Sequence, residues 1–214
     1  MQRLSRCIQH LELHLENLLG RLPWFRFFRE TRDHNNPRTF RIWFWQKVMG
    51  FNRDVYWPCH RSSVINGWRH VRVGVDTAPG YAPGCYIQGI GKIVIGNYTN
   101  IAQNVAIISS NHDLHDGRKQ VPEEVRIGDY CWIGFGAVIL PGVVLGDHTV
   151  VGAGSVVTHP FPEGNCVIAG NPARLIRTLE KDRLVRYQHP HPYQGYFAPG
   201  PRLEKFLRWN VHAK

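Results

Sequence analysis

Residues 127–162 decide the fold, and they read as six consecutive blocks of six residues: IGDYCW, IGFGAV, ILPGVV, LGDHTV, VGAGSV and VTHPFP. Every block opens on an aliphatic residue, and in four blocks glycine follows it. A period of six fits neither the helical repeat nor the simple alternation of a strand. Short strands joined by tight corners and repeated in register would wind the chain into stacked triangular coils, with three blocks in each coil. The structural alternative is a run of turn-rich antiparallel strands.

The repeat also predicts where the hydrophobic core lies. Each coil would pair with the next about 4.8 Å along the axis, and the aliphatic openers would point inward as a continuous stack. The fifth position of each block faces a corner and is small as far as Ser155, before Phe161 ends the run. Residues 73–107 hold a less regular set of blocks, in which a slip of four residues at GKIV distorts one corner.

The repeat is lost over residues 108–126, between these two sets of blocks. The segment ISSNHDLHDGRKQVPEEVR is polar and too long for a corner, so we expect it to project outward as a loop. Loops that project from a rigid scaffold often carry functional residues. The search for catalytic groups therefore begins there.

Residues 1–55 are predicted to form a helical extension rich in aromatic and basic side chains. A helix over residues 4–22 would collect its aliphatic side chains on one face, which we expect to pack on the domain surface or against a helix in an oligomer. These side chains are Leu4, Ile8, Leu11, Leu15, Leu18 and Leu22. The segments WFRFFRE (24–30) and FRIWFWQKVMGF (40–51) either cap the open end of the coils or meet a membrane surface.

The coil domain is predicted to span residues 56–172, with the loop 108–126 inside it. Residues 173–214 would follow as a short helix, over residues 173–186, and a proline-rich tail. That tail either wraps a neighbouring subunit or stays free of the domain.

Composition limits the class of protein further. The chain has 214 residues, a formal net charge of +10 and 43% hydrophobic residues, which suits one main domain with extensions. Its five cysteines are odd in number and lack any CxxC pair, so we expect neither a disulfide framework nor a thiolate metal site, and a cytoplasmic location. The positive charge predicts an anionic partner: nucleic acid, anionic lipid or a phosphate-rich cofactor such as coenzyme A.

Over residues 56–179 the sequence resembles the hexapeptide-repeat acyltransferases, whose repeat is [LIV]-[GAED]-x-x-[STAV]-x and whose fold is a left-handed parallel β-helix. It looks most like their sugar and antibiotic O-acetyltransferase branch, of the galactoside, maltose and colanic-acid types. The left hand comes from this resemblance alone, because crossovers between parallel strands are ordinarily right-handed. The resemblance implies an all-β domain with helical extensions, acetyl-CoA as co-substrate, a homotrimer, and neither a metal nor nucleic acid.

The resemblance also singles out a catalytic base. Acyl transfer to a hydroxyl needs a group that takes the hydroxyl proton, and histidine is suited to this near neutral pH. The family has its histidine in the first loop that interrupts the coils, which here corresponds to NHD at residues 111–113 and therefore to His112. Asp113 is the nearest candidate to orient the imidazole, and His115 is the substitute base or an acceptor contact.

Acceptor and cofactor residues follow from two further segments. Trp132, in CWIG, matches a family tryptophan that lines the acceptor cleft, whereas Gln88 is a guess for the family's acceptor asparagine. Phe135 stands where relatives have a serine, which leaves the N–H of Gly134 as the substitute oxyanion donor. The closing segment AGNPARLIR resembles the family's G-x-P-A-[KR] motif, in which small residues admit coenzyme A and a basic residue meets its phosphate. The predicted cofactor-binding residues are Gly134, Gly152, Ala169, Gly170, Pro172, Arg174 and Arg177.

The leading hypothesis is therefore an acetyl-CoA-dependent O-acetyltransferase that acts directly on a sugar or polysaccharide-precursor hydroxyl, with His112 as general base. It would work in the cytoplasm, with a peripheral contact at the inner face of the membrane through residues 1–55 as an open alternative to coil capping. Two other functions remain open: a non-catalytic β-helix scaffold, and a γ-type zinc carbonic anhydrase, which gathers three histidines at a subunit interface. The second alternative lacks an obvious third ligand and leaves the GNPAR segment unexplained.

Overall fold

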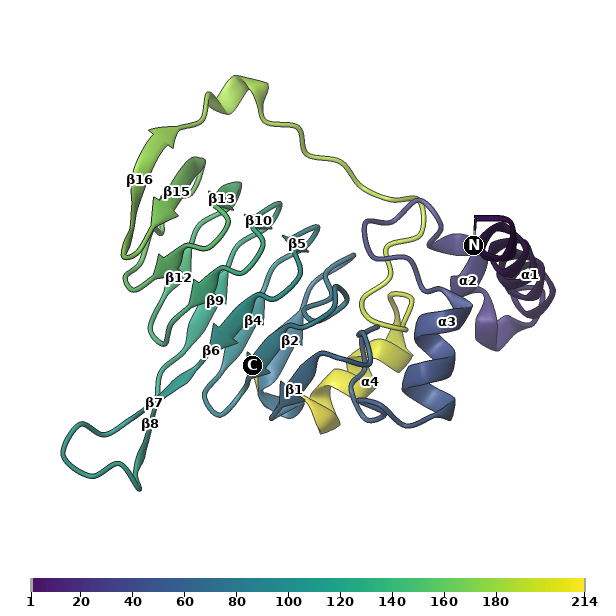
Figure 1. The fold of residues 1–214 in the computed structure, drawn as a ribbon, viewed down its shortest axis with the longest axis horizontal. Helices are drawn as coiled ribbons and strands as arrows, with labels where there is room; N and C mark the ends of the chain where they lie inside the picture. The colour runs from purple at the N-terminus through teal and green to yellow at the C-terminus, as the bar shows by residue number, and fades with distance from the viewer. Residues whose placement is uncertain (1, 214) are drawn as a thin grey trace.

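Three parallel sheets form the faces of a coil stack in the computed structural model, which describes residues 2–213 and their side chains from residue 9 onward (Figure 1). The first sheet contains β1 (Val64–Asn66), β3 (Tyr86–Gln88), β6 (Ala106–Ile108), β11 (Val138–Ile139) and β14 (Val156–Val157). The second contains β2 (Val71–Val73), β4 (Ile93–Ile95), β9 (Val125–Ile127) and β12 (Val144–Leu145). The third contains β5 (Asn100–Ile101), β10 (Trp132–Ile133), β13 (Thr149–Val151) and β15 (Cys166–Gly170).

From β3 to β14, with the β7–β8 hairpin set aside, consecutive strands visit the three sheets in turn, which confirms the predicted coils and excludes the antiparallel alternative. Val138 pairs with Val156 one coil later, a separation of 156 − 138 = 18 residues, or three blocks of six. Val138 also pairs with Ala106 one coil earlier, a separation of 138 − 106 = 32 residues, so this coil carries 14 extra residues. These extra residues contain the hairpin of β7 (Ser110–His112) and β8 (Gln120–Pro122).

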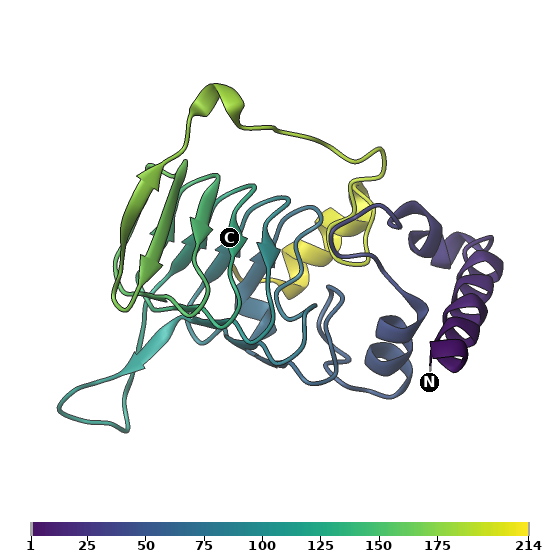
Figure 2. The same ribbon diagram turned by 45° about the horizontal axis from the view of Figure 1, so that its top comes forward.

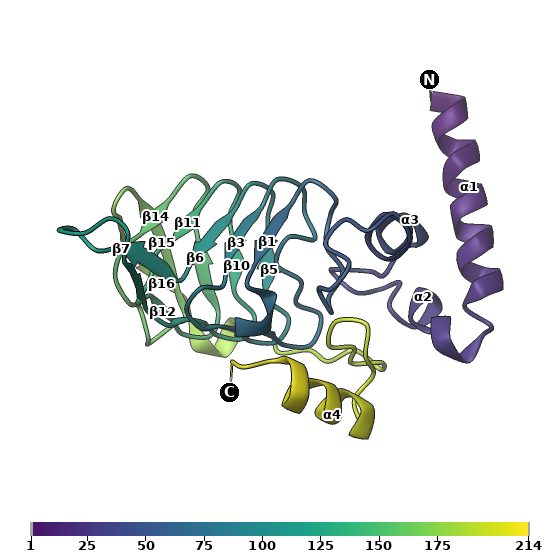
Figure 3. The ribbon, with the colours of Figure 1, turned by 90° about the horizontal axis from the view of Figure 1, so that it is seen from below.

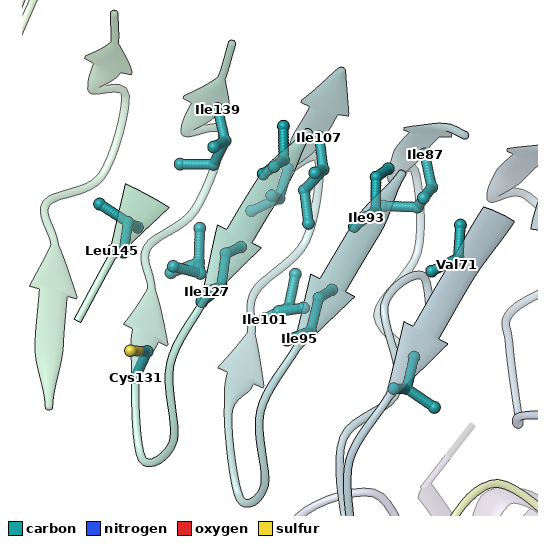
Figure 4. Close-up of a cluster of buried hydrophobic side chains, with 14 of the residues drawn as sticks. Val71, Ile87, Ile93, Ile95, Ile101, Ile107, Ile127, Cys131, Ile139 and Leu145 are labelled. Carbon is teal, nitrogen blue, oxygen red and sulfur yellow. The ribbon is translucent and has the colours of Figure 1, made fainter. Parts of the chain in front are cut away.

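The hydrophobic core runs along the axis of the stack, as the repeat predicts. The inward side chains of successive coils lie over one another (Figure 4), and Ile87, Ile107 and Ile139 of the first sheet are each fully buried. In the second sheet the early strands turn two side chains inward instead of one: both Ile93 and Ile95 are buried. This second inward residue explains the slip at GKIV. Strand β9 also turns two side chains inward, those of Val125 and Ile127, so the chain is back in the core at Val125. The projecting segment is therefore shorter than the predicted 108–126.

The N-terminal extension contains α1 (Gln2–Leu19), η1 (Pro23–Phe25), α2 (Phe27–Glu30), α3 (Phe40–Trp43) and η2 (Phe44–Val48). It closes one end of the stack, with α1 outermost and crossing the coil axis (Figure 3). Phe27 and Phe28 are buried in a second apolar cluster that also contains Tyr193 from the C-terminal part of the chain. The predicted helix is confirmed as α1, but Leu11 and Leu18 of its predicted packing face are 62% and 57% exposed. Leu4 and Ile8 lie outside the described side chains. Among the helices described, none is both long and apolar enough to span a bilayer.

The prediction of a helix over residues 173–186 is wrong. Residues Ala173–Thr178 form strand β16, which pairs antiparallel with β15, and only the short η4 (Lys181–Arg183) follows. The last coil leaves the edge of β15 unpaired, and β16 covers that edge with backbone hydrogen bonds. A helix does occur later, as α4 (Pro201–Asn210), which lies along the outside of the stack near η3 (Trp68–His70).

Residues 184–197 form a strap that runs back along the outside of the coils from the last coil to the N-terminal extension (Figures 1 and 2). Arg38, which is 1% exposed, fixes the far end of the strap by donating through Nε and Nη2 to the carbonyl of Gly195 at 2.9 and 2.6 Å. Burial lowers the pKa of Arg38 to about 10. The strap therefore connects the two ends of the stack through a buried charged group.

Candidate active site

The β7–β8 hairpin carries the predicted catalytic histidine at the end of its first strand. The antiparallel register places His112 opposite Gln120. The carboxylate of Asp113 accepts the backbone N–H groups of His115 and Asp116 at 2.8 and 2.9 Å, which fixes the turn at the tip. Both His112 and His115 are exposed.

The position of the His112 proton follows from its nearest partner. Its Nδ1 lies 2.6 Å from the carbonyl oxygen of Gly117. A carbonyl only accepts hydrogen bonds, so Nδ1 carries the proton and the lone pair is on Nε2. Nε2 is therefore the acceptor nitrogen, and the side-chain amide of Gln120 donates to it across 3.2 Å at an exposed edge of the molecule.

A chain of side-chain contacts connects His112 to the coils. The amide nitrogen of Gln120 lies 3.2 Å from Nε2 of His112, and its amide oxygen accepts the hydroxyl of Ser110 at 2.8 Å. The backbone N–H of Ser110 donates in turn to the side-chain oxygen of Gln88 at 3.1 Å. Gln88 therefore lies at the base of the hairpin, on the same side of the molecule as His112.

Contrary to what the sequence predicted, Asp113 does not orient the imidazole of His112. Its carboxylate is engaged by the turn, and the backbone carbonyl of Gly117 holds the imidazole instead. Ser109, in the same segment, is not available as a nucleophile, because its buried hydroxyl has its single proton engaged by the carbonyls of Gln88 and Gly91. Gly117 and Gln120 are the residues that sequence reasoning missed. Asp116-Gly117 is a turn signal that predicts a hairpin, although a two-residue loop there would pair His112 with Val121, one residue away from its observed partner Gln120.

A second group of predicted site residues lies on the outer surface of the third sheet. Register pairs Trp132 with Val150, Val150 with Val167, and Val167 with Arg177 of β16. These residues form an outward row, and Trp132 at one end is 56% exposed. With neighbouring strands about 4.8 Å apart, the row from Trp132 to Arg177 measures about 14 Å. An aromatic ring and a guanidinium group thus lie on one surface.

The other predicted cofactor residues form two groups, one accessible at the last coil and one packed between neighbouring coils. Arg174 pairs with Ala169 in the same antiparallel ladder and is exposed, as are Gly170 and Pro172. These four residues and Arg177 form one accessible segment at the last coil.

Gly134 and Gly152 have a packing role instead. A Cβ at Gly134 would lie 2.6 Å from the carbonyl oxygen of Val151, and one at Gly152 would lie 2.8 Å from the Cβ of Ala169. The N–H of Gly134 already donates to Val151 at 2.9 Å, so the prediction that it serves as an oxyanion donor is wrong. Neighbouring coils approach too closely at these two positions for a side chain.

Within one chain the two groups of residues are apart. The hairpin leaves the stack between the first and second sheets, whereas Trp132 and the arginines belong to the third sheet and its extension. Figure 1 shows β7 and β8 projecting from the lower edge of the stack, with β10 and β16 toward the upper edge. One chain therefore presents a proton acceptor on one face and a surface with cationic groups on another.

A cluster of His34, Asp76 and His189 has metal-ligand chemistry, with one donor atom from each within 4.8 Å of the others. Its contacts are those of a hydrogen-bond network, however. Nδ1 of His34 lies 2.9 Å from a guanidinium nitrogen of Arg38, which donates to it, and Nε2 donates to the carbonyl of His191 at 3.0 Å. A cation at Nδ1 would have to displace that guanidinium group, so the residues present do not fit a metal.

Comparisons with known proteins point to one family. The family model described as bacterial transferase hexapeptide (six repeats) matches residues 124–159. Galactoside O-acetyltransferase from Escherichia coli (strain K12) is 41% identical over 99 residues, which cover 44% of this chain and 48% of that protein. The chain spans about half the length of the curated relatives it matches.

Solved structures extend the likeness to most of the chain. A maltose O-acetyltransferase from Clostridium difficile 630 has a TM-score of 0.53 at 29% identity, with 81% of this chain and 89% of that chain covered. A galactoside acetyltransferase in complex with coenzyme A has a TM-score of 0.56 at 24% identity, with coverage of 86% and 90%. At this identity, the similarity to the galactoside acetyltransferase supports only a shared fold.

Proposed function

The chain carries the hexapeptide repeat of bacterial transferases, and from that premise we propose that it is an acetyl-CoA-dependent O-acetyltransferase. The acceptor is a hydroxyl group of a sugar or polysaccharide precursor, as the names of its relatives suggest. The coils take the left hand of that family. The domain division proposed is an N-terminal extension of residues 1–55, a coil domain of residues 56–172 and a C-terminal part of residues 173–214.

The observation that carries this function is the fixed tautomer of His112. With the proton held on Nδ1 by Gly117, the acceptor hydroxyl replaces the amide of Gln120 at Nε2, and Nε2 takes its proton as the hydroxyl oxygen attacks the thioester carbonyl. The carbon–sulfur bond then breaks, and the proton passes from Nε2 to the departing thiolate of coenzyme A. Acetyl transfer is direct, without an acyl-enzyme.

The complete site is formed by two chains of a homotrimer. The hairpin of one chain supplies His112 with Gln88 near it, and the third sheet of its neighbour supplies Trp132 and the cofactor residues. The separation of these two groups within one chain supports this arrangement, because each chain by itself holds only half of the required chemistry. Cyclic symmetry places the same pair of surfaces at all three interfaces.

Coenzyme A lies along the outer surface of the third sheet. Ala169, Gly170 and Pro172 offer little steric hindrance there, and the exposed guanidinium groups of Arg174 and Arg177 meet its phosphates. Their place in one antiparallel ladder, facing the same side as Trp132, supports the assignment. The hydrogen-bond donor for the oxyanion comes from groups at the interface between chains, because the N–H of Gly134 already donates to the carbonyl of Val151.

Substitution of His112 tests the proposal. His112→Ala should lower turnover about 10²- to 10⁴-fold, the usual contribution of a positioned general base, while coenzyme A affinity and thermal stability stay unchanged because the side chain is exposed. His115→Ala, a change of the same kind in the same hairpin, is the control and should keep most of the activity. Loss of activity in the control alone would transfer the role of base to His115. A chain that binds coenzyme A but acetylates no acceptor would support the scaffold alternative.

A further inference from the structure

Helix α1 packs on the domain through two carboxylates and through Leu19, which lies against the apolar cluster of Phe27 and Phe28. Glu12 accepts the backbone N–H and the guanidinium group of Arg41, each at 3.0 Å. Glu16 is buried and accepts the backbone N–H of Phe40 at 2.8 Å. The inward side of α1 is therefore fixed by polar contacts with α3, and Leu15 and Leu19 lie beside them, each partly covered.

One flank of the same helix carries exposed leucines, whereas the side opposite Glu12 and Glu16 carries the exposed polar residues His10, His14 and Asn17. Leu11 and Leu18 lie two turns apart on that flank and are 62% and 57% exposed, and Leu22, just after the end of the helix, is 47% exposed. Trp24, just beyond the helix, is 73% exposed. Contiguous apolar stripes of this kind on a protein surface mark a contact with another apolar phase. Figure 3 shows that this helix stands at the far end of the molecule, with its outer side turned away from the coils.

Positive charge surrounds this stripe. Residues 1–62 contain eleven arginine and lysine residues against five aspartate and glutamate residues, a net charge of 11 − 5 = +6 out of +10 for the whole chain. Several of these side chains are directly next to α1: the stem of Arg29 lies over Gly20, and Arg32 donates to Asn17. Arg21 is exposed between the helix and Trp24.

We propose that the exposed apolar flank of α1 together with the segment just after it, defined by Leu11, Leu18, Leu22 and Trp24, docks on an anionic lipid bilayer with the helix lying in the plane of the interface. An apolar stripe bordered by basic side chains is the composition that such interfacial helices require. Tryptophan is favoured at the boundary between headgroups and acyl chains. A second copy of this chain is the weaker candidate, since pairing two α1 faces would bring two segments of charge +6 together.

Vesicle binding tests this surface without reference to acetyl transfer. The full chain, free of acetyl-CoA, is sedimented with vesicles of phosphatidylcholine alone or mixed with phosphatidylglycerol. It should bind the mixed vesicles, bind the neutral ones at least tenfold more weakly, and be released by salt, because basic groups near an anionic surface contribute a screened attraction.

Two variants assign the binding to α1. Leu11→Gln/Leu18→Gln should bind the mixed vesicles at least tenfold more weakly, since both side chains would otherwise enter the apolar layer. Leu114→Gln changes a leucine that is 96% exposed at the hairpin tip and should bind as the unaltered chain does. Both variants should keep the melting temperature, because the three leucines are largely exposed in the folded chain.

Three outcomes would overturn the proposal. Equal binding of the α1 variant and the unaltered chain would remove the helix from the contact. Equal binding to neutral and anionic vesicles would remove the role of charge. A smaller assembly for the α1 variant in light scattering, with no vesicle binding by the unaltered chain, would assign the stripe to a contact between copies. None of these depends on the proposed acetyl transfer, so each function can fail alone.

Discussion

A single histidine that the repeat places on the surface is buried in the structure. His148 occupies an outward position of its block, yet it is only 7% exposed. Its ring stacks on that of Tyr130 at 5.0 Å, with the two planes 7° apart, and Tyr130 stacks on Tyr98 in the same way at one corner of the coils. Strap residues Tyr187 and Arg186 lie against this ladder. A six-residue pattern describes one coil and carries no information about a strap that covers its corner.

Burial lowers the pKa of His148, and nearby Arg186 lowers it further, against the opposing carboxylates of Asp147 and Asp129. In the unfolded chain the imidazole binds a proton below about pH 6.5, whereas the folded chain resists this to a lower pH. Stability from this group is therefore present above about pH 6.5 and is lost as the pH falls.

Replacement of His148 should remove this dependence. We chose His148→Asn because the backbone has φ 55° there, which asparagine tolerates. Denaturant unfolding at several pH values should show the free-energy advantage of the unaltered chain over the variant shrinking between pH 7.5 and 5.5. An advantage that stays constant or grows toward acid would contradict the assignment.

The histidine of the proposed reaction was predictable from the sequence, but the group that orients it was not. His112 and His115 are the two of twelve histidines that stand in the segment that breaks the repeat, and the resemblance of NHD to the family motif favours His112. Its actual partner is the carbonyl of Gly117, a group that every residue carries, so no side-chain pattern marks it. Asp113 was the natural choice because its carboxylate is adjacent, yet the turn uses that carboxylate first.

At the scale of elements, the proposed part of strand β16 in binding coenzyme A depends on its two arginines, Arg174 and Arg177. If Arg174 and Arg177 meet phosphates of coenzyme A, Arg177→Ala should raise the Michaelis constant for acetyl-CoA about 10- to 100-fold, since a charge-assisted contact contributes about 1.5–3 kcal/mol. Arg174→Ala should act in the same direction.

Dephospho-coenzyme A thioesters provide the selective control for this pair. These thioesters lack only the ribose 3′-phosphate and keep the diphosphate, so their use should be almost unaffected by a substitution that removes a contact to the 3′-phosphate. Arg208→Ala, at an exposed position of α4, should change the Michaelis constant for neither thioester. Equal losses with both thioesters and an unchanged melting temperature would assign the arginines to the diphosphate, whereas equal losses with a lowered melting temperature would show that β16 supports the fold of the last coil.

The sequence predicts best those elements in which apolar side chains recur at a regular spacing. The coils follow from their aliphatic openers, and α1 from its leucine spacing. The side of α1 that packs could not be predicted, because polar contacts of Glu12 and Glu16 outweigh the apolar pattern. The predicted helix over residues 173–186 failed for a related reason, since an unpaired strand edge elsewhere in the chain decides the conformation of β16.

At the scale of the whole molecule, the proposed trimer can be tested by complementation. His112→Ala and Trp132→Ala chains should each be inactive as homotrimers, because every interface lacks one group. Co-expressed, they should regain part of the activity, since some interfaces then join an intact His112 to an intact Trp132.

Light scattering provides the independent measurement of assembly. The active protein should have three times the 24.6 kDa mass of one chain. Activity in a species of 24.6 kDa, or a co-expressed mixture as inactive as its components, would contradict a site shared between chains.

The strap also changes how the stack is expected to come apart. A stack of repeats contacts only its neighbours, so its terminal repeats can fray while the middle stays folded. Here the strap joins the last coil to the N-terminal extension, where Arg38 donates a buried hydrogen bond to Gly195, and to the first coils, where Asp76 accepts a hydrogen bond from His189. Neither end can open without releasing the other, and the linear stack becomes a closed loop of contacts. Backbone amides of the first and last coils should therefore exchange with solvent deuterium at similar slow rates, whereas fast exchange confined to the last coil would mean that the strap leaves the ends independent.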